Sequence, residues 1–326
     1  MALRPLPLLA LRILGKLFRT VVVLLGVLTL VFVVVRAVPG DPAVSILGEQ
    51  APPEELARLR GEMGLDRPLP EQFARYLGQV LDGSLGTPYS RARSGTTVGD
   101  LVREVIPYTL ELALSAVLVA ICLALPLGLL AALYRNRAVD HGALAITLVG
   151  IAMPGFWLGP LLIHFVSIRL GLLPDPAAGV QGLPSLVLPA FVLGLALSAK
   201  LTRMVRTSVL DVLEQPYVMA ARARGLPRHR VVIRHVLRNA LIPVATVLGL
   251  QFAALLSGAI IAEKVFARPG IGTLLLEGIA QRDYAIVQGT ALFIGAVYVL
   301  VNFVVDLLYM AIDPRIAHSF ARGGRE

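Results

Sequence analysis

Long apolar runs divide the chain, and shorter polar segments separate them. A helix that crosses about 30 Å of hydrocarbon needs about 20 apolar residues, and six segments reach that length. The predicted spans are Thr20–Val38, Thr109–Tyr134, Leu144–Leu173, Leu183–Val205, Leu241–Ala262 and Ala285–Ile312. Prolines inside these spans predict kinks, because proline leaves a carbonyl group of the helix without its hydrogen bond; in a membrane, neighbouring helices can supply a replacement donor. These prolines are Pro126, Pro154, Pro160 and Pro189. The pattern predicts an all-α integral membrane protein with six transmembrane helices.

The first apolar run follows four basic residues, so a cleaved signal peptide is an alternative to a first span. The apolar core of a signal peptide is only about 7–15 residues long and precedes a small-x-small cleavage site. The run here is longer, and no such site follows it. We therefore expect an uncleaved first span.

Composition supports the membrane class. Hydrophobic residues make up 56% of the 326 positions and charged residues only 16%, which is too little charge to cover the surface of a soluble protein. The single cysteine, Cys122, rules out an intramolecular disulfide framework and cannot form a metal site alone. The net charge of +9 could suggest nucleic-acid binding, but the placement of the basic residues favours a membrane orientation instead.

Charge predicts the orientation. If the N-terminus is cytoplasmic, the inner segments together hold 18 basic and five acidic residues, whereas the loop from Pro39 to Pro107 holds seven arginines and ten acidic residues. Basic residues concentrate on the cytoplasmic side of membrane proteins. We therefore expect cytoplasmic termini and an extracytoplasmic loop in a multi-pass protein of a bacterial or archaeal cytoplasmic (inner) membrane.

The outer loop has helix signals, so it is not expected to be irregular. Asp41 can cap a helix that begins at Pro42, and Gly64 can end a second one. Apolar residues near its end, from Val98 to Val105, share one helix face and predict an interfacial helix leading into span two. We divide the chain into residues 1–97 (first span and outer loop), a core of residues 98–312 and a cytoplasmic tail of residues 313–326.

The segment "YVMAARARGLPRHRVVIRHVLRNALIP", Tyr217–Pro243, begins in the inner loop at residues 207–240 and ends in the fifth predicted span. It contains six arginines and no acidic residue. Arg230, Arg234 and Arg238 recur every four residues, and so do Ile233, Leu237 and Leu241, which places two ridges on one helix. Small residues precede them and end at Gly225. Contact with lipid headgroups would explain the charge. Two short helices with a small face favour a docking element for another protein.

"MAARARG", Met219–Gly225, resembles the cytoplasmic EAA signature of ABC-importer permeases, with Met219 where the general pattern has Glu. The dipeptide/oligopeptide/nickel permease branch departs from that pattern in the same way. Other stretches also resemble that branch, in the same order along nearly the whole chain: "VPGDP", "TLELAL", "MPGFW", "LPAFVLG", "AEKVFARPGIG", "QRDYAIVQG" and "VDLLYMAIDPRI".

This resemblance implies a MetI-like type I ABC-importer permease fold and four kinds of partner. These are a second homologous permease, two cytoplasmic ATPases that bind ATP and Mg, an extracytoplasmic solute-binding protein and membrane lipid. No cofactor is expected on this chain, because it has no phosphate-binding G-x4-G-K-[ST] loop. The residues expected to couple it to the ATPase are Tyr217, Met219, Ala220, Ala221, Arg224 and Gly225.

Ionisable or polar residues within predicted spans are candidates for the translocation path because they are costly in a membrane. Glu111, Gln251 and Asp306 qualify, although each could instead join neighbouring helices. Pro269, Gly270 and Gly272 form a predicted tight turn, which the resemblance places at the outer mouth. His164 stands without a carboxylate or thiol grouping, so no metal site is expected, and nickel gains no support as a substrate.

The resemblance therefore implies a permease subunit of an ATP-driven importer of dipeptides and oligopeptides. Two other classes of function remain as alternatives. A stand-alone secondary transporter or channel would show inverted repeats or intramembrane charge relays. A membrane enzyme would need clustered catalytic residues. The sequence shows neither pattern.

Overall fold

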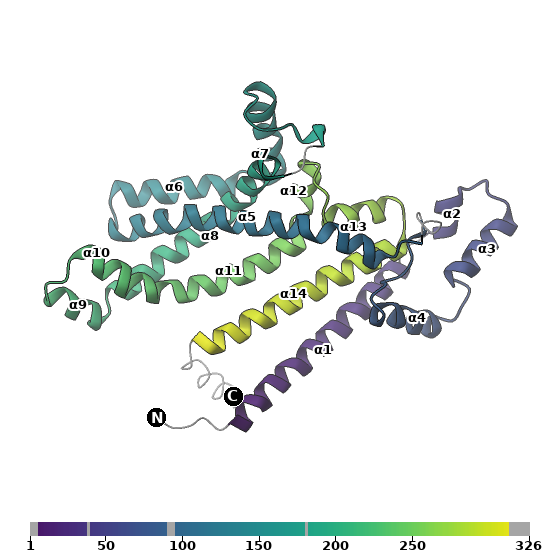
Figure 1. Cartoon of the computed structure of the whole chain (residues 1–326), viewed down its shortest axis with the longest axis horizontal. Coiled ribbons are helices and arrows are strands. Elements are labelled where there is room, and N and C mark those ends of the chain that lie inside the picture. Colours follow the sequence, from purple (N-terminus) through teal and green to yellow (C-terminus); the bar gives the residue numbers. More distant parts are fainter. Residues whose placement is uncertain (1–5, 38–39, 90–94, 180–181, 313–326) are drawn as a thin grey trace. The chain divides into compact units, whose positions relative to one another are not determined.

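The computed structural model describes residues 6–37, 40–89, 95–179 and 182–312, and all regular elements in these ranges are helices (Figure 1). Five helical runs are long and apolar enough to cross a membrane. They are α1 (Leu6–Ala37), α5 (Val98–Leu133), α8 (Leu183–Leu213), the run Arg228–Leu256 and α14 (Tyr284–Ile312). They coincide with predicted spans one, two, four, five and six. The predicted tail lies outside the described residues.

The third predicted span is not one continuous helix. It is divided between α6 (Ala138–Ala152), α7 (Gly155–Leu162) and a π-helical segment, η2 (Ile163–Arg169), and the axis bends by 91° at the break. Proline lacks an N–H group and disfavours helical geometry in the residue before it, and Met153 and Pro154 are both extended. The proline predicted to kink this span therefore breaks it, and the sixth crossing requires the bent pair to count as one span.

The chain forms two compact units, which we describe separately. The first consists of residues 1–109 and 269–303, and the second of residues 110–268 and 304–326. Helices α5 and α14 contribute residues to both units.

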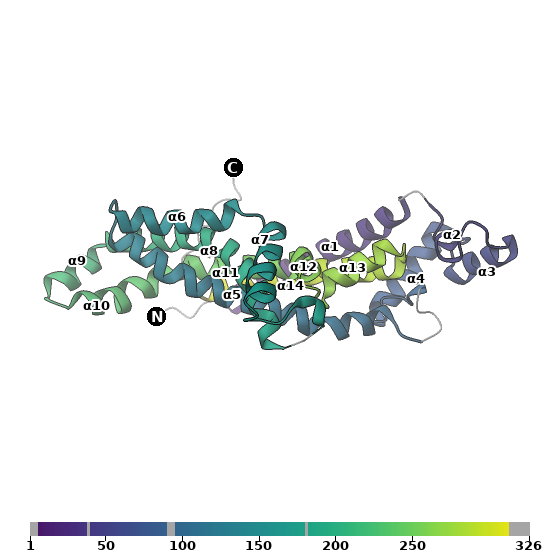
Figure 2. The same cartoon turned by 90° about the horizontal axis from the view of Figure 1, so that it is seen from above.

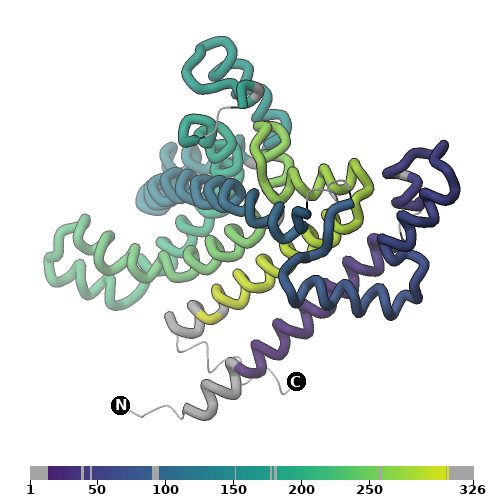
Figure 3. Tube along the Cα trace, turned by 45° about the vertical axis from the view of Figure 1, so that its right-hand side comes forward, coloured from purple at the N-terminus to yellow at the C-terminus, as the bar shows by residue number. Residues whose placement is uncertain are grey.

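In the first unit, α1 is followed by three loop helices: α2 (Pro42–Leu47), α3 (Pro53–Met63) and α4 (Leu69–Leu81) (purple to blue in Figure 3). As predicted, Asp41 caps α2 by accepting a 2.9 Å hydrogen bond from the N–H of Ala43. Gly64 ends α3 in a left-handed conformation. Phe73 and Tyr76 of α4 pack against Phe32 of α1, so α4 is anchored to the first span.

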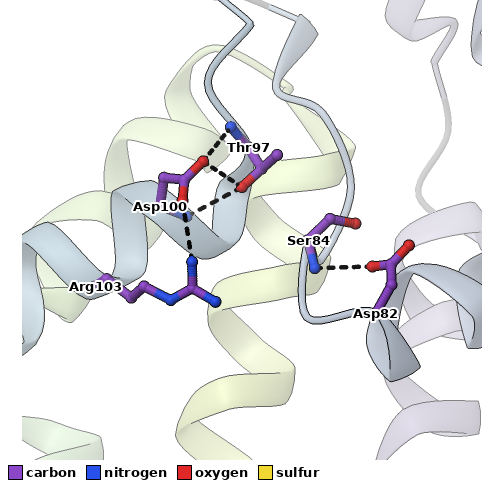
Figure 4. Close-up of polar contacts among 5 residues, drawn as sticks. All are labelled: Asp82, Ser84, Thr97, Asp100 and Arg103. Atoms are coloured by element: carbon purple, nitrogen blue, oxygen red, sulfur yellow. Dashed lines mark hydrogen bonds and ion pairs between the residues drawn. The ribbon is translucent and has the colours of Figure 1, made fainter.

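The start of α5 is fixed by a capping box (Figure 4). The Asp100 carboxylate accepts hydrogen bonds from the N–H and hydroxyl of Thr97, whose hydroxyl accepts one from the N–H of Asp100. In the preceding turn, the Asp82 carboxylate accepts a hydrogen bond from the N–H of Ser84 (Figure 4), which holds the pKa of Asp82 below its usual value. The contacts between Thr97 and Asp100 fix the start of α5, and the bond between Asp82 and Ser84 fixes the turn that follows α4.

The apolar face predicted from Val98 to Val105 is confirmed, but it does not belong to a separate helix. Val98, Leu101 and Val102 are buried in the first turns of α5, against Leu274 and Ile286. The predicted interfacial helix is therefore part of the spanning helix and packs on protein.

Leu274 belongs to α13 (Ile271–Ala280), a short helix that the apolar pattern did not predict. Its first N–H group, that of Ile271, donates to the hydroxyl of Thr109 at 3.0 Å. Gly272 is buried inside this helix. The predicted tight turn at Pro269, Gly270 and Gly272 is therefore wrong at Gly272, because the chain becomes helical at Ile271.

In the second unit, α8 packs against α6 and α11 (Arg238–Gly258), and Figure 2 shows α6 beside α8. Helix α5 also lies close to α8, because small residues allow it. A Cβ atom on Gly128 of α5 would lie 2.8 Å from the carbonyl oxygen of Thr202, and one on Gly194 of α8 would lie 2.8 Å from that of Ala116. Small residues of this kind allow membrane helices to pack with their backbones in close contact.

The small residues of α5 form a stripe with four-residue spacing. We call Ala116, Ala120, Ala124 and Gly128 the α5 small-residue stripe; its three alanines are at most 1% exposed. On α8, Ser198 and Thr202 continue the spacing of Gly194, and their hydroxyls donate to carbonyl oxygens of the same helix. Packing at this contact therefore leaves no hydroxyl donor of these two residues unmatched.

The remaining elements of this unit are η3 (Pro176–Ala178), α12 (Ile260–Val265), α9 (Pro216–Ala223), α10 (Arg228–Arg230) and the π-helical segment η4 (Val231–Leu237). Phe266, directly after α12, packs with Leu188 and Val192 of α8 and with residues of α7 and η2. The last three elements form the candidate site.

Candidate functional site

The predicted docking element is a helical hairpin, residues 216–240, which we call the α9 hairpin (Figure 1). Helix α8 ends at Leu213, and Pro216 occupies the first turn of α9, a position where its missing N–H group costs nothing. Gly225 ends α9 with a φ angle of +75°, a conformation that favours glycine. After Pro227, the chain resumes as a helix that continues into α11.

The inner face of the hairpin belongs to the core of the chain itself. Val218 and Ala221 of α9 are buried with Val231 and Val236 of η4 and with Val209 of α8. Ala221 is only 7% exposed. Its small side chain is thus explained by packing inside the hairpin, so the close-contact surface predicted at Ala220, Ala221 and Gly225 is interrupted at Ala221.

The outer face combines exposed apolar groups with small residues. The side chains of Tyr217, Met219 and Ile233 are 43%, 54% and 65% exposed, and Ala220 and Ala223 are exposed between them. The hydroxyl oxygen of Tyr217 accepts a 2.8 Å hydrogen bond from the Asn239 amide. This bond ties α9 to the start of α11 and holds the outer face in place.

The predicted arginine ridge is exposed: Arg230, Arg234 and Arg238 all face away from the core. The companion apolar ridge is confirmed at Leu237 and Leu241, which pack partly buried against the core, but it is wrong at Ile233, which is exposed. The fully buried residues are instead Val231, Val232, Val236 and Ala240. The cause is the π-helical segment. Its i→i+5 hydrogen bonds widen the turn, so buried residues recur five apart, from Val231 to Val236, where the prediction assumed four.

The hairpin carries a concentrated positive charge, with six arginines and no acidic residue. None of its six arginines makes an ion pair with a carboxylate among the described residues. The hairpin therefore presents apolar side chains and unneutralised cationic charge together, as surfaces that bind an acidic partner do.

A second group of polar side chains lies elsewhere in the same unit. Glu111 of α5 lies 3.5 Å from Nη2 of Arg268, whose Nη1 donates to the hydroxyl of Ser185 at 3.1 Å. Arg268 is 3% exposed, whereas the Glu111 side chain is 58% exposed. Glu111 thus joins neighbouring elements, which was one of the two roles expected of it, and still presents a carboxylate outside the core.

The other predicted path residues are not brought into this group by any described contact. Gln251 is partly buried on α11, and the side chain of Asp306 on α14 lies outside what the structure describes. Among the described residues, no three His, Cys, Asp or Glu side chains gather as a metal site requires.

Two charged residues that the sequence did not single out form the best-defined ion pair of the unit. Asp140 of α6 is 1% exposed and receives two hydrogen bonds from Arg206 of α8, at 2.8 and 2.7 Å. The two residues lie 66 positions apart, so no local sequence signal connects them.

Comparisons with known proteins agree with this architecture. Residues 124–318 match the model of the family described as "Binding-protein-dependent transport system inner membrane component", and residues 9–113 match the model of its N-terminal region. Over 65% of the chain and 96% of the other, the fold is similar to an inward-facing structure of the MetNI methionine ABC transporter, with a TM-score of 0.54 and 19% sequence identity.

Curated relatives extend the similarity over almost the whole chain. The dipeptide transport system permease protein DppB of Escherichia coli K12 is 38% identical over 94% of this chain and 98% of its own. The di/tripeptide permease DppB of Pseudomonas aeruginosa is 40% identical, over 90% and 95%. The glutathione permease GsiC of Salmonella paratyphi A is 39% identical, over 94% and 99%.

The chain therefore belongs to the binding-protein-dependent transport system inner membrane component family, the membrane permeases of ABC importers. It is a transmembrane permease subunit, and its ATPase is a separate protein.

Proposed function

We propose that this permease forms half of a translocation path for dipeptides and short oligopeptides. The support is that relatives 38–40% identical over at least 90% of the chain carry names of dipeptide, di/tripeptide and glutathione permeases. In this proposal a homologous permease supplies the other half of the path. An extracytoplasmic binding protein delivers the peptide, and two cytoplasmic ATPases bind ATP and Mg.

The α9 hairpin is the proposed contact with one ATPase. The observation that carries this assignment is the combination of exposed Tyr217, Met219 and Ile233 with arginines that have no carboxylate partner among the described residues. Ala220, Arg224 and Gly225 complete the contact surface, and Ala221 supports it from inside. Exposed apolar area provides binding energy, and the positive charge selects an acidic groove.

The residues of the translocation path and of the outer mouth are proposed from fewer observations than the α9 hairpin. The exposed carboxylate of Glu111, held by the buried Arg268, is suited to meet the amino terminus of a peptide. Gln251 and Asp306 are proposed to line the same path. Pro269, Gly270 and Gly272 are proposed to lie near the docking site of the binding protein.

Transport by the reconstituted complex tests the proposed function. Proteoliposomes that contain both permeases and both ATPases are expected to accumulate radiolabelled dialanine, provided that the binding protein is outside and ATP inside. Unlabelled dipeptides should compete, and the isolated permease should not bind ATP because it lacks a phosphate loop. ATP-dependent uptake of nickel without uptake of any peptide would contradict the peptide assignment.

Orientation is a separate expectation, because it depends on the charge distribution. We expect the loop helices to be extracytoplasmic and the α9 hairpin and both termini to be cytoplasmic. In a Cys122→Ser background, a membrane-impermeant maleimide should label Leu81→Cys from outside intact cells and His229→Cys only after permeabilisation. Both positions are exposed, so labelling of both from one side would refute this topology.

A further inference from the structure

The ion pair between Asp140 and Arg206 has a geometry that fixes the two side chains relative to each other. Arg206 donates from Nε to Oδ1 at 2.8 Å and from Nη2 to Oδ2 at 2.7 Å. Two parallel bonds of this kind fix the orientation of both side chains, unlike a single charge contact. Asp140 is 1% exposed, and the Arg206 side chain is 23% exposed, so water competes little for the pair.

The same carboxylate also fixes the turn between α5 and α6. Asn136 lies in this turn with a φ angle of +61°, a left-handed conformation that asparagine adopts more readily than most residues. Its N–H group donates to Oδ2 of Asp140 at 2.9 Å. One buried carboxylate therefore holds the turn of residues 134–137 and the side of α8 together.

Helix α8 leads from Arg206 to the α9 hairpin. Leu213, where α8 ends, lies seven positions after Arg206; at about 1.5 Å per residue this is about 10 Å of helix. Only Glu214 and Gln215 then precede α9. A displacement of α9 thus reaches Arg206 through less than two turns of continuous helix.

We propose that Asp140 and Arg206 are positioning residues that join the α5–α6 turn to the end of α8, so that α5 and α6 follow the movement of the α9 hairpin. This inference rests on the proposed contact between that hairpin and an ATPase. Asp140→Asn and Arg206→Lys both lose the charge-assisted two-bond geometry, so the α5–α6 turn is then held to the end of α8 by helix packing alone and can shift relative to the α9 hairpin.

A nearby exposed pair provides a matched control. Arg135 of the same turn and Glu214 at the end of α8 lie 3.5 Å apart, with side chains 55% and 74% exposed. Exposed pairs of this kind contribute little. Glu214→Gln, which breaks this pair, is therefore expected to behave like the wild type.

The test measures movement directly. Nitroxide labels at Arg137→Cys and His229→Cys, both exposed positions, report the distance between the α5–α6 turn and the α9 hairpin in the assembled complex, with Cys122→Ser removing the native thiol. We expect the wild-type distance to be the same without nucleotide and in the vanadate-trapped state. In Asp140→Asn the distance should differ between the two states.

ATP hydrolysis provides the second readout. In Asp140→Asn, stimulation by dialanine-loaded binding protein should fall about 2- to 30-fold, the range typical of mutations that alter coupling. Arg206→Lys keeps the charge but loses the two-bond geometry, so it should show a smaller loss. If Asp140→Asn fails to assemble, Arg206→Lys and the wild-type distances decide the question.

Two results would overturn the inference: a wild-type distance that changes between the states in a coupled complex, or normal stimulation in an assembled Asp140→Asn complex. A different result would show that the proposed ATPase contact itself is wrong: the ATPases would then bind the permeases equally well when the α9 hairpin is altered.

Discussion

Replacement of Ala220 by tryptophan is expected to detach the ATPase from an otherwise folded permease. Ala220 is exposed on α9, so the large ring does not enter the core of the chain. At a packed interface, however, overfilling costs about 1–3 kcal/mol by analogy with overpacked cores. That is roughly a 5- to 150-fold weaker association. Co-purification of the ATPases and peptide-stimulated ATP hydrolysis should both fall accordingly.

Two further variants distinguish an ATPase contact at the α9 hairpin from simple binding of the hairpin to lipid. Ala57→Trp places the same ring on an exposed position of α3 and should have no effect. The triple change Arg230→Ala, Arg234→Ala and Arg238→Ala removes only charge. If the hairpin merely binds lipid, the triple change should be the more harmful, and Ala220→Trp should retain normal ATPase binding and stimulation.

Gly128→Leu and Gly194→Leu are expected to prevent stable packing of α5 on α8. Each new Cβ would lie within 3 Å of a backbone carbonyl oxygen of the other helix, so a side-chain rotation cannot relieve the clash. Overpacking typically costs about 1–3 kcal/mol and occasionally more, and a rigid backbone contact belongs at the upper end. We expect low accumulation in membranes and a clear loss of thermal stability in detergent.

Gly142→Leu is the matched control for this prediction. Gly142 lies on α6, and a Cβ atom added there would have no neighbouring atom within 4 Å, so the same substitution meets open space. Normal accumulation of all three variants would show that α5 and α8 do not approach as closely as the structure indicates.

The spanning helices could be predicted from the sequence because their length in apolar residues is itself the signal. Helices α1, α8 and α14 follow directly from it. The third span could not be predicted as it is, because an apolar run does not reveal whether Pro154 kinks or breaks a helix. The buried face of η4 was missed for a related reason: apolar spacing of four assumes an α-helix, and the segment is π-helical.

The candidate site was predictable in part. The position of the α9 hairpin and its arginines follows from charge, since these residues have to lie outside the apolar spans. Which alanines face outward does not follow, because Ala220 and Ala221 are chemically identical and only packing against Val231 and Val236 distinguishes them. The α5 small-residue stripe does have a sequence signal, a four-residue repeat of alanine and glycine, which was hidden among equally apolar neighbours.

The α5 small-residue stripe has a consequence for biogenesis. About 80 residues separate the end of α5 from the end of α8, and at about 5–20 residues per second their synthesis takes roughly 4–16 s. During this interval α5 has no α8 to pack against, and its alanine and glycine face remains open to lipid or to membrane chaperones. A chain whose synthesis stops before Leu183 would therefore have a second span without its close contact with α8, and we expect membrane proteases to degrade such a fragment.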